Sequence, residues 1–254
     1  EPLAARAASL PALYDFELMQ GGGHLRGFAV RGEPAQQARA ALERLSDKAA
    51  FEEKYHVRGK SPLVFAVGDG NHSLATARQC WLSLRETLPE AARAAHPARF
   101  ALVEVVNLHD PSLRFEPIHR VLFDVDPDHL FHHLRVYYDL STEPCEGQAF
   151  ELVSAETRQR VWVRDPSSHL AAGTLQAFLD RYLESFGGRV DYIHGEDVVL
   201  RLASQPGTAG FLLPKMKKNE LFPTVVLDGA LPRKTFSMGH AQDKRFYLEA
   251  KRIV

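Results

Sequence analysis

The sequence predicts an α+β protein, in which a mixed β-sheet is flanked by helices and a second lobe is rich in strands. A continuous apolar run at residues 63–67 and a mainly apolar run at residues 100–108 have the composition of buried strands. A helical pattern lies between them, and this order allows a right-handed crossover within one sheet. Short strand patterns follow residue 136.

The length and composition favour one large domain or two small ones. The chain has 254 residues, of which 45% are hydrophobic and 25% are charged, and these values are typical of a folded protein with a large core. The change in character near residue 136 predicts a loop-bearing α/β lobe over residues 1–135 and a second α+β lobe over residues 136–254.

Local patterns predict the remaining elements. The glycines at 21–23 indicate a hairpin between residues 13–18 and 25–30. The amphipathic helix at 174–186 should end at Gly187. The other expected elements are helices at 34–55, 73–88, 127–135 and 197–203, strands at 136–140, 150–153, 161–163 and 210–214, and a polar connection at 215–222.

Charge and composition exclude several classes of partner. The formal net charge is −1, so no basic field favours nucleic acid. No apolar run approaches the roughly 20 residues of a membrane span. Cys80 and Cys145 are too few for a disulfide framework, and no basic-then-apolar segment opens the chain, so we expect a cytoplasmic protein.

The stretch from Pro62 to Ala77 reads as a strand, a glycine turn and the start of a helix. Four polar residues lie where that helix begins, namely Asp69, Asn71, His72 and Ser73. The free N–H groups and the dipole of a helix start favour an anion such as phosphate. The alternative is a helix cap alone, with Gly70 making the turn.

Further polar side chains follow other apolar runs, and they would converge if the strands share a sheet. Their mixture of cations, hydroxyls and carboxylates suits phosphoryl transfer with a carboxylate-held magnesium ion. In that interpretation Arg233 and Lys234 neutralise phosphate, Asp69 or Asp110 holds the metal, and Glu104 or Glu116 acts as a general base.

Structural interpretations of the same residues stay open. Arg120 is also suited to a salt bridge, Arg233 and Lys234 to a solvated turn, and His109 to a strand end. His129, His132 and His133 fit a solvated helix face better than a metal site, because no further ligand motif accompanies them. The sequence contains no Walker motif, no protein-kinase loop, no G-x-S-x-G and no complete G-x-G-x-x-G.

Five segments, in order along the chain, resemble the bacterial and archaeal family called domain of unknown function 1015. They are Gly68–Ala77, Val105–Leu113, Phe115–Arg120, Gly210–Pro214 and Leu231–Gly239. Members of that family are usually longer at the N-terminus, so the resemblance implies that this chain corresponds to the C-terminal two-thirds of a member.

The family's opening loop, D-G-H-H-R, is similar to the phosphate loop of the ParB/sulfiredoxin-like fold, which includes archaeal free serine kinases. Asp69, Gly70 and His72 match this pattern, whereas Asn71 and Ser73 replace the histidine and the arginine. Losing the arginine removes a bidentate phosphate contact. Arg78, Arg120 or Lys234 would have to compensate.

The resemblance and the residue patterns together define a candidate site. Its catalytic residues are Asp69, His72 and Glu116, and its magnesium ligands are Asp69 and Asp110. Its phosphate- or nucleotide-binding residues are Gly70, Asn71, Ser73, His119, Arg120, Arg233, Lys234, Thr235 and Ser237.

Two functions of different class follow. The first is a nucleotide-dependent phosphotransferase that acts on a small hydroxyl compound, for example free serine, with ATP or ADP and Mg²⁺ implied by the resemblance. The second is a non-catalytic nucleotide- or metabolite-binding regulatory module, which the serine at position 73 favours. Either would bind a small molecule, with neither nucleic acid nor membrane as partner, and a homodimer is left open.

Overall fold

The computed structural model describes residues 3–68, 70–238 and 249–253. The chain forms two compact units: unit 1 comprises residues 1–107 and 242–254, and unit 2 comprises residues 108–241. This division lies before the predicted boundary at 135/136. The reason is that β3 (Phe115–Phe123) and α5 (Pro127–Tyr137) belong to the sheet and the core of unit 2.

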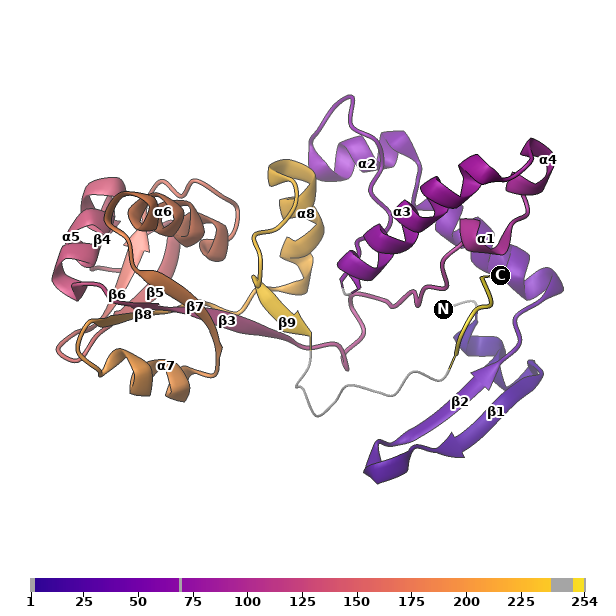
Figure 1. The fold of residues 1–254 in the computed structure, drawn as a ribbon, viewed down its shortest axis with the longest axis horizontal. Helices are drawn as coiled ribbons and strands as arrows, with labels where there is room; N and C mark the ends of the chain where they lie inside the picture. Colours follow the sequence, from indigo (N-terminus) through magenta and orange to yellow (C-terminus); the bar gives the residue numbers. More distant parts are fainter. Residues whose placement is uncertain (1–2, 69, 239–248, 254) are drawn as a thin grey trace. The chain divides into compact units, whose positions relative to one another are not determined.

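Unit 1 is mainly helical and carries a separate two-stranded sheet, the predicted hairpin (Figure 1). The predicted helix at 34–55 is divided in two, because the Asp47 side chain accepts a hydrogen bond from the Ala50 N–H at 2.8 Å and starts a new helix. The elements of unit 1 are η1 (Ala4–Ser9), β1 (Ala12–Glu17), η2 (Met19–Gly21), β2 (His24–Phe28), α1 (Gly32–Arg44), α2 (Lys48–Tyr55), α3 (Asn71–Thr87), α4 (Glu90–Arg93) and η3 (Pro97–Arg99), where η marks a 3-10 helix.

The two apolar runs that predicted buried strands form no strands in the described structure. Residues 63–67 and 101–107 lie in no sheet of the described chain, and most of their large apolar side chains are exposed. The prediction was wrong because an apolar run records a tendency toward burial, whereas a strand needs a neighbour to accept and donate its backbone hydrogen bonds. The shared sheet expected to bring His109 and Asp110 to the loop at 68–73 is therefore not formed.

Unit 2 is built on a seven-stranded sheet, and it confirms the α+β class. The strand order is β4-β6-β5-β8-β3-β7, with β9 also pairing with β3, and every pairing is antiparallel. Besides β3 and α5, its elements are β4 (Leu140–Ser141), β5 (Gln148–Val153), β6 (Arg158–Val163), α6 (Ala171–Phe186), β7 (Arg189–His194), α7 (Glu196–Ala203), β8 (Thr208–Leu212), α8 (Lys218–Asp228) and β9 (Phe236–Met238).

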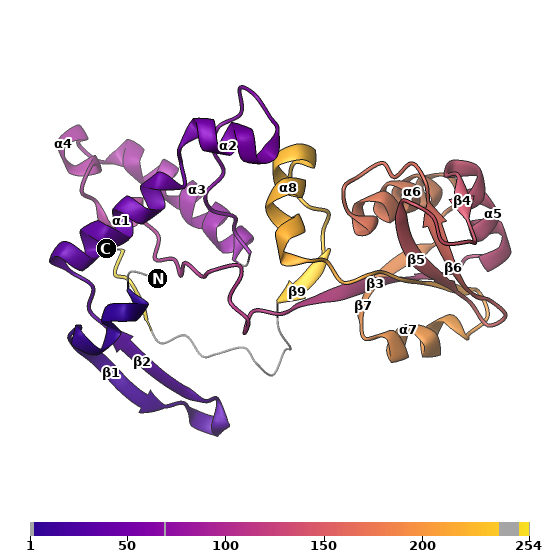
Figure 2. The same ribbon diagram turned by 180° about the vertical axis from the view of Figure 1, so that it is seen from behind.

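Alternating residues of the central strands supply two apolar layers. Leu122 and Phe211 pack with α5 and α6 on one face, while Val121 and Leu212 pack with α7 on the other. Figure 1 and the reverse view in Figure 2 both show these helices on opposite faces of the sheet. A Cβ at Gly210 would lie 2.7 Å from Val199 Cγ1, so a glycine at this position lets α7 approach β8 closely.

The predicted polar connection at 215–222 is instead the start of α8. The Lys217 N–H donates to Glu220 Oε2 at 2.7 Å, which is part of a capping box, and the helix continues through Pro223. The sequence did not predict this helix, because a proline ordinarily breaks the interior of a helix. Among the helices of the described ranges, none is long and apolar enough to cross a membrane.

Matched leucine substitutions test the difference between the sheet core and the exposed runs. Leu152 on β5 is 0% exposed, and Leu102 is 53% exposed. We expect Leu152→Ala to lower the free energy of unfolding of unit 2 by about 2–5 kcal/mol. Leu102→Ala should change the free energy of unfolding of unit 1 by less than about 0.5 kcal/mol.

The two tryptophans allow the unfolding of each unit to be measured separately. Trp81 lies in unit 1 and Trp162 in unit 2, so Trp162→Phe and Trp81→Phe backgrounds leave one fluorescent reporter in each unit during denaturant unfolding. A loss of 2 kcal/mol or more in Leu102→Ala would show that residues 101–107 are buried in solution.

Candidate functional site

Several predicted site residues come together in unit 2, where β3 pairs with β7 and β9. In the register of β3, Glu116 lies opposite Ser237 on β9, and Arg120 lies opposite Tyr192 on β7. The turn from Pro232 to Thr235 leads into β9. These pairings between strands far apart in sequence form what we call the β3–β9 cluster, defined by Glu116, His119, Arg120, Tyr192, His194, Arg233, Lys234, Thr235 and Ser237.

Arg120 is the buried centre of the β3–β9 cluster. Its side chain is 0% exposed, and no carboxylate of the described residues lies within ion-pair distance. The guanidinium instead donates to Gln176 Oε1 at 3.1 Å, to the Ile118 carbonyl at 2.7 Å and to the Lys234 carbonyl at 3.1 Å. Burial lowers the pKa of Arg120 to about 10, which leaves the group charged at neutral pH.

These bonds hold the turn before β9 in an unusual conformation. Arg120 also reaches the Arg233 carbonyl at 3.4 Å, and Thr235 Oγ1 donates to the Pro232 carbonyl at 2.7 Å. Lys234 has a φ of 53°, a value that non-glycine residues rarely adopt. Arg120 therefore acts on this turn through its backbone, as a positioning residue.

The result is a pair of cations at one aromatic ring. Arg120 Cζ lies 4.5 Å and Lys234 Nζ lies 5.2 Å from the centre of the Tyr192 ring. Both distances suit cation–π attraction. Unlike Arg120, Lys234 is exposed, and its ammonium forms no ion pair with a described residue. Its charge is therefore available to an anion from solvent.

His119 lies on the opposite face of β3 from Arg120. Its side chain is buried, and its Nδ1 accepts a hydrogen bond from the Leu213 N–H at 3.1 Å. Burial lowers the pKa of His119, and the charge of Arg120 lowers it further, whereas Glu196 opposes both. The imidazole is therefore neutral near pH 7, in a structural link between β3 and the end of β8.

The remaining members of the cluster differ in their freedom to react. Glu116 Oε1 accepts a hydrogen bond from Lys215 Nζ at 2.8 Å, so the proposed general base is held in an ion pair. Ser237 Oγ and His194 Nδ1 are 3.5 Å apart, at the long limit of a hydrogen bond. Both side chains are partly or fully exposed and can meet a ligand.

The predicted phosphate loop lies in unit 1, at the start of α3. Gly70 has a φ of 76° and precedes the helix, and its carbonyl accepts from the Leu74 N–H at 2.9 Å. Asn71, His72 and Ser73 form the exposed first turn. Asp69, predicted as a catalytic residue and magnesium ligand, lies outside the described residues. The predicted strand before the loop is absent, but the helix start is present.

Asp110 belongs to unit 2, and its carboxylate stabilises a turn by accepting hydrogen bonds from Ser112. Its Oδ1 accepts from the Ser112 N–H at 2.9 Å and from Ser112 Oγ at 2.5 Å, and these bonds lower the pKa of Asp110. Within the described ranges, no group of three histidine, cysteine, aspartate or glutamate side chains could hold a metal ion. The magnesium ligands Asp69 and Asp110 thus stay a prediction from the residue pattern.

Sequence reasoning missed Tyr192 and a second polar cluster around Asp228. Asp228 accepts hydrogen bonds from Ser168 Oγ at 2.9 Å, from the His169 N–H at 2.7 Å and from His169 Nδ1. Burial raises the pKa of Asp228, but these hydrogen bonds outweigh it and lower the pKa overall. Ser168 and His169 bind the same carboxylate, so the serine is not activated as in a catalytic triad. No local pattern marks either feature, because both depend on pairings distant in sequence.

The β3–β9 cluster thus combines an exposed lysine, a serine hydroxyl and an imidazole with a buried arginine at one end of the sheet. The family comparison agrees with the resemblance. The model of the family described as protein of unknown function (DUF1015) matches residues 2–182, which is more than half of the chain, so the chain belongs to this family.

The family match covers the N-terminal part of this chain, and residues 210–214 and 231–239 lie outside it. It gives no support to the expectation that the chain corresponds to the family's C-terminal two-thirds, and the likeness to ParB/sulfiredoxin-like proteins stays a prediction. No curated protein and no solved structure matches the chain.

The lowered pKa of His119 predicts a pH dependence. As the pH falls below about 6.5, the unfolded chain binds a proton at His119 that the folded unit does not, so unit 2 loses stability. The amide oxygen of His119→Asn can still accept a hydrogen bond from the Leu213 N–H. In this variant the contribution of residue 119 to the pH dependence of the free energy of unfolding should vanish. Denaturant unfolding followed by Trp162 at pH 7.5 and pH 5.5 measures both slopes. Equal slopes would contradict a neutral, buried His119.

Proposed function

We propose that this protein handles the phosphate group of a small molecule, and that it acts as a nucleotide-dependent phosphotransferase on a small hydroxyl compound such as free serine. The observation that carries the phosphate part is the Lys234 ammonium beside Tyr192, exposed and without an ion-pair partner among the described residues. A lysine ammonium is a compact charge that suits phosphate oxygens.

The neighbours of Lys234 support an anion. Ser237 and His194 add a hydroxyl and an imidazole, both able to donate hydrogen bonds to phosphate oxygens. Glu116, the predicted carboxylate of the cluster, is paired with Lys215. The buried charge of Arg120 adds to the positive potential without being exposed to water. The electrostatic balance of the β3–β9 cluster thus favours a ligand with negative charge.

The catalytic part of the proposal comes from the family resemblance. There the loop at 68–73 holds nucleotide phosphates at a helix start, and ATP or ADP and Mg²⁺ are implied. The exposed N–H groups at the start of α3, after the left-handed Gly70, are suited to that role. In such chemistry the protein contributes mainly positioning and charge neutralisation.

A second candidate is a module that binds a nucleotide or metabolite without turnover. Two observations favour it: Glu116 is tied to Lys215, and the Asp110 carboxylate is occupied by Ser112. In each of these two carboxylates one oxygen already accepts a hydrogen bond, which favours binding without catalysis. Ser73, in place of the expected arginine, also weakens a catalytic phosphate loop.

Calorimetric titration with ADP and O-phosphoserine tests the shared phosphate claim. Lys234→Met should weaken the binding of the phosphorylated ligand about tenfold or more, because it removes a charged partner. Lys54→Met is a matched control, since Lys54 Nζ also lies 5.2 Å from a tyrosine ring, that of Tyr55 in unit 1. Equal binding by Lys234→Met and Lys54→Met would overturn the proposed role of the β3–β9 cluster.

Mass spectrometry of pooled metabolites incubated with the protein, ATP or ADP, and Mg²⁺ separates the two candidates. A phosphorylated product that disappears in His72→Ala supports the phosphotransferase. Ligand binding without any product, in the same preparation, supports the binding module. Absence of both binding and product would contradict both candidates.

A further inference from the structure

A separate cavity in unit 1 is lined by three arginines and a tryptophan. It has a volume of about 730 Å³, within the range of small-molecule sites. It lies between the C-terminal half of α3, α4 and η3, and it contains none of the residues discussed above as functional. Its lining residues are Trp81, Arg85, Glu86, Glu90, Arg93 and Arg99, together with Ala94.

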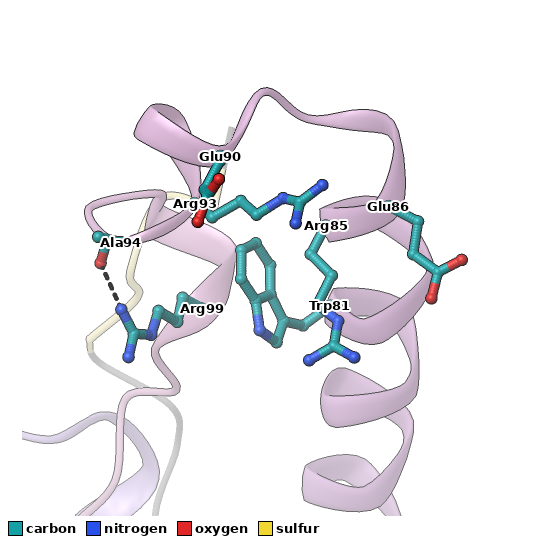
Figure 3. Close-up of a pocket in the computed structure, with 7 residues that line it drawn as sticks. All are labelled: Trp81, Arg85, Glu86, Glu90, Arg93, Ala94 and Arg99. Atoms are coloured by element: carbon teal, nitrogen blue, oxygen red, sulfur yellow. Dashed lines mark hydrogen bonds between the residues drawn. The ribbon is translucent and has the colours of Figure 1, made fainter.

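The cavity lining places arginines from α3, α4 and η3 around one tryptophan. Trp81 and Arg85 are four residues apart on α3 and therefore share a helix face. Figure 3 shows the indole of Trp81 with Arg99 on one side, the guanidinium of Arg93 near its upper edge and Arg85 beside it, while Glu86 points away. The His96 ring stacks on the indole, with 5.7 Å between centres and 25° between planes, and supports it.

Two of the arginines are held in place by backbone acceptors. Arg93 Nε donates to the Leu88 carbonyl at 3.0 Å, and Arg99 donates through one terminal nitrogen to the Ala94 carbonyl at 2.9 Å. Each bond uses part of a five-donor guanidinium, so other N–H groups remain for a ligand. Anchoring also lowers the entropy that each side chain loses when a ligand binds.

The charges of these arginines are not neutralised within the described chain. Arg85, Arg93 and Arg99 form no ion pair with a described residue, although two glutamates line the same cavity. Three positively charged side chains line one cavity, and an anion with several charged oxygens would be attracted to them. Guanidinium groups suit phosphate oxygens particularly well, because they bind them in pairs of parallel hydrogen bonds.

We propose that the arginine cavity of unit 1 binds an oligophosphate, that is, two or more linked phosphate groups, supplied either by a nucleoside polyphosphate or by an inorganic polyphosphate. The indole would lie against the base in the first case, as aromatic side chains do with nucleobases. This site is distinct from the β3–β9 cluster and does not depend on the function proposed for that cluster.

Trp81 provides a direct test. In a Trp162→Phe background it is the single tryptophan, and its fluorescence is followed during separate titrations with tripolyphosphate, ATP and orthophosphate. Tripolyphosphate and ATP should both change the emission and bind at least tenfold more tightly than orthophosphate. Tighter binding of ATP than of tripolyphosphate identifies the nucleoside as the preferred source, and equal binding identifies the phosphate chain.

Variants locate the site. Arg85→Gln and Arg99→Gln should each weaken tripolyphosphate binding about tenfold or more, whereas Arg44→Gln, at the exposed end of α1, should leave it unchanged. Circular dichroism melts confirm that each variant is folded. No emission change with millimolar tripolyphosphate or ATP, or equal affinity in the Arg85, Arg99 and Arg44 variants, would overturn the proposal.

Discussion

A single buried guanidinium links the elements at the end of unit 2 where β3 pairs with β7 and β9. Arg120 lies in the middle of the sheet, and its hydrogen bonds join β3, α6 and the turn before β9. A buried charge is costly unless its donors are satisfied, and here carbonyls and an amide satisfy them in place of a carboxylate. The guanidinium therefore has no direct ion-pair partner among the described residues, although the charge of Asp180 also favours its charged form.

The two apolar layers explain why such a residue is tolerated in the sheet. β3 lies between β8 and β7, so its side chains alternate between the layer under α5 and α6 and the layer under α7. Arg120 lies on the same face of β3 as the first layer. Its guanidinium donates to Gln176 and lies over the ring face of Tyr192. Removing the guanidinium would leave the carbonyls of Ile118 and Lys234 without their donor.

Local patterns predicted the elements whose boundaries are set by local chemistry. The helix after Gly70 and the helix that ends at Gly187 were predicted close to their observed bounds, because a positive φ at each glycine starts or ends the helix. Strand patterns at 150–153 and 161–163 predicted parts of β5 and β6. The runs at 63–67 and 100–108 were not predicted correctly, since their apolar composition contains no information about a pairing partner.

The candidate site was predicted only as a set of residue types. The sequence identified Arg120, Lys234 and Ser237 as polar residues near apolar runs, and the sheet register brought them together. The role of Arg120 could not be predicted, because it depends on Tyr192 opposite it and on carbonyls more than 100 residues away. The arginine cavity of unit 1 was missed for a similar reason, since α3 and η3 meet only in the folded chain.

The most direct test of this account is an NMR measurement on ¹³C-dimethylated lysines, which keep their charge. Lys234 should show a ring-current shift from Tyr192, as Lys54 should from Tyr55, and phosphate should perturb Lys234 alone of these two. In Arg120→Met we expect the Lys234 shift and its response to phosphate to be lost, while the resonances of Lys54 and Lys215 stay unchanged. An unaltered Lys234 resonance in Arg120→Met would contradict the claim that the buried guanidinium positions this lysine.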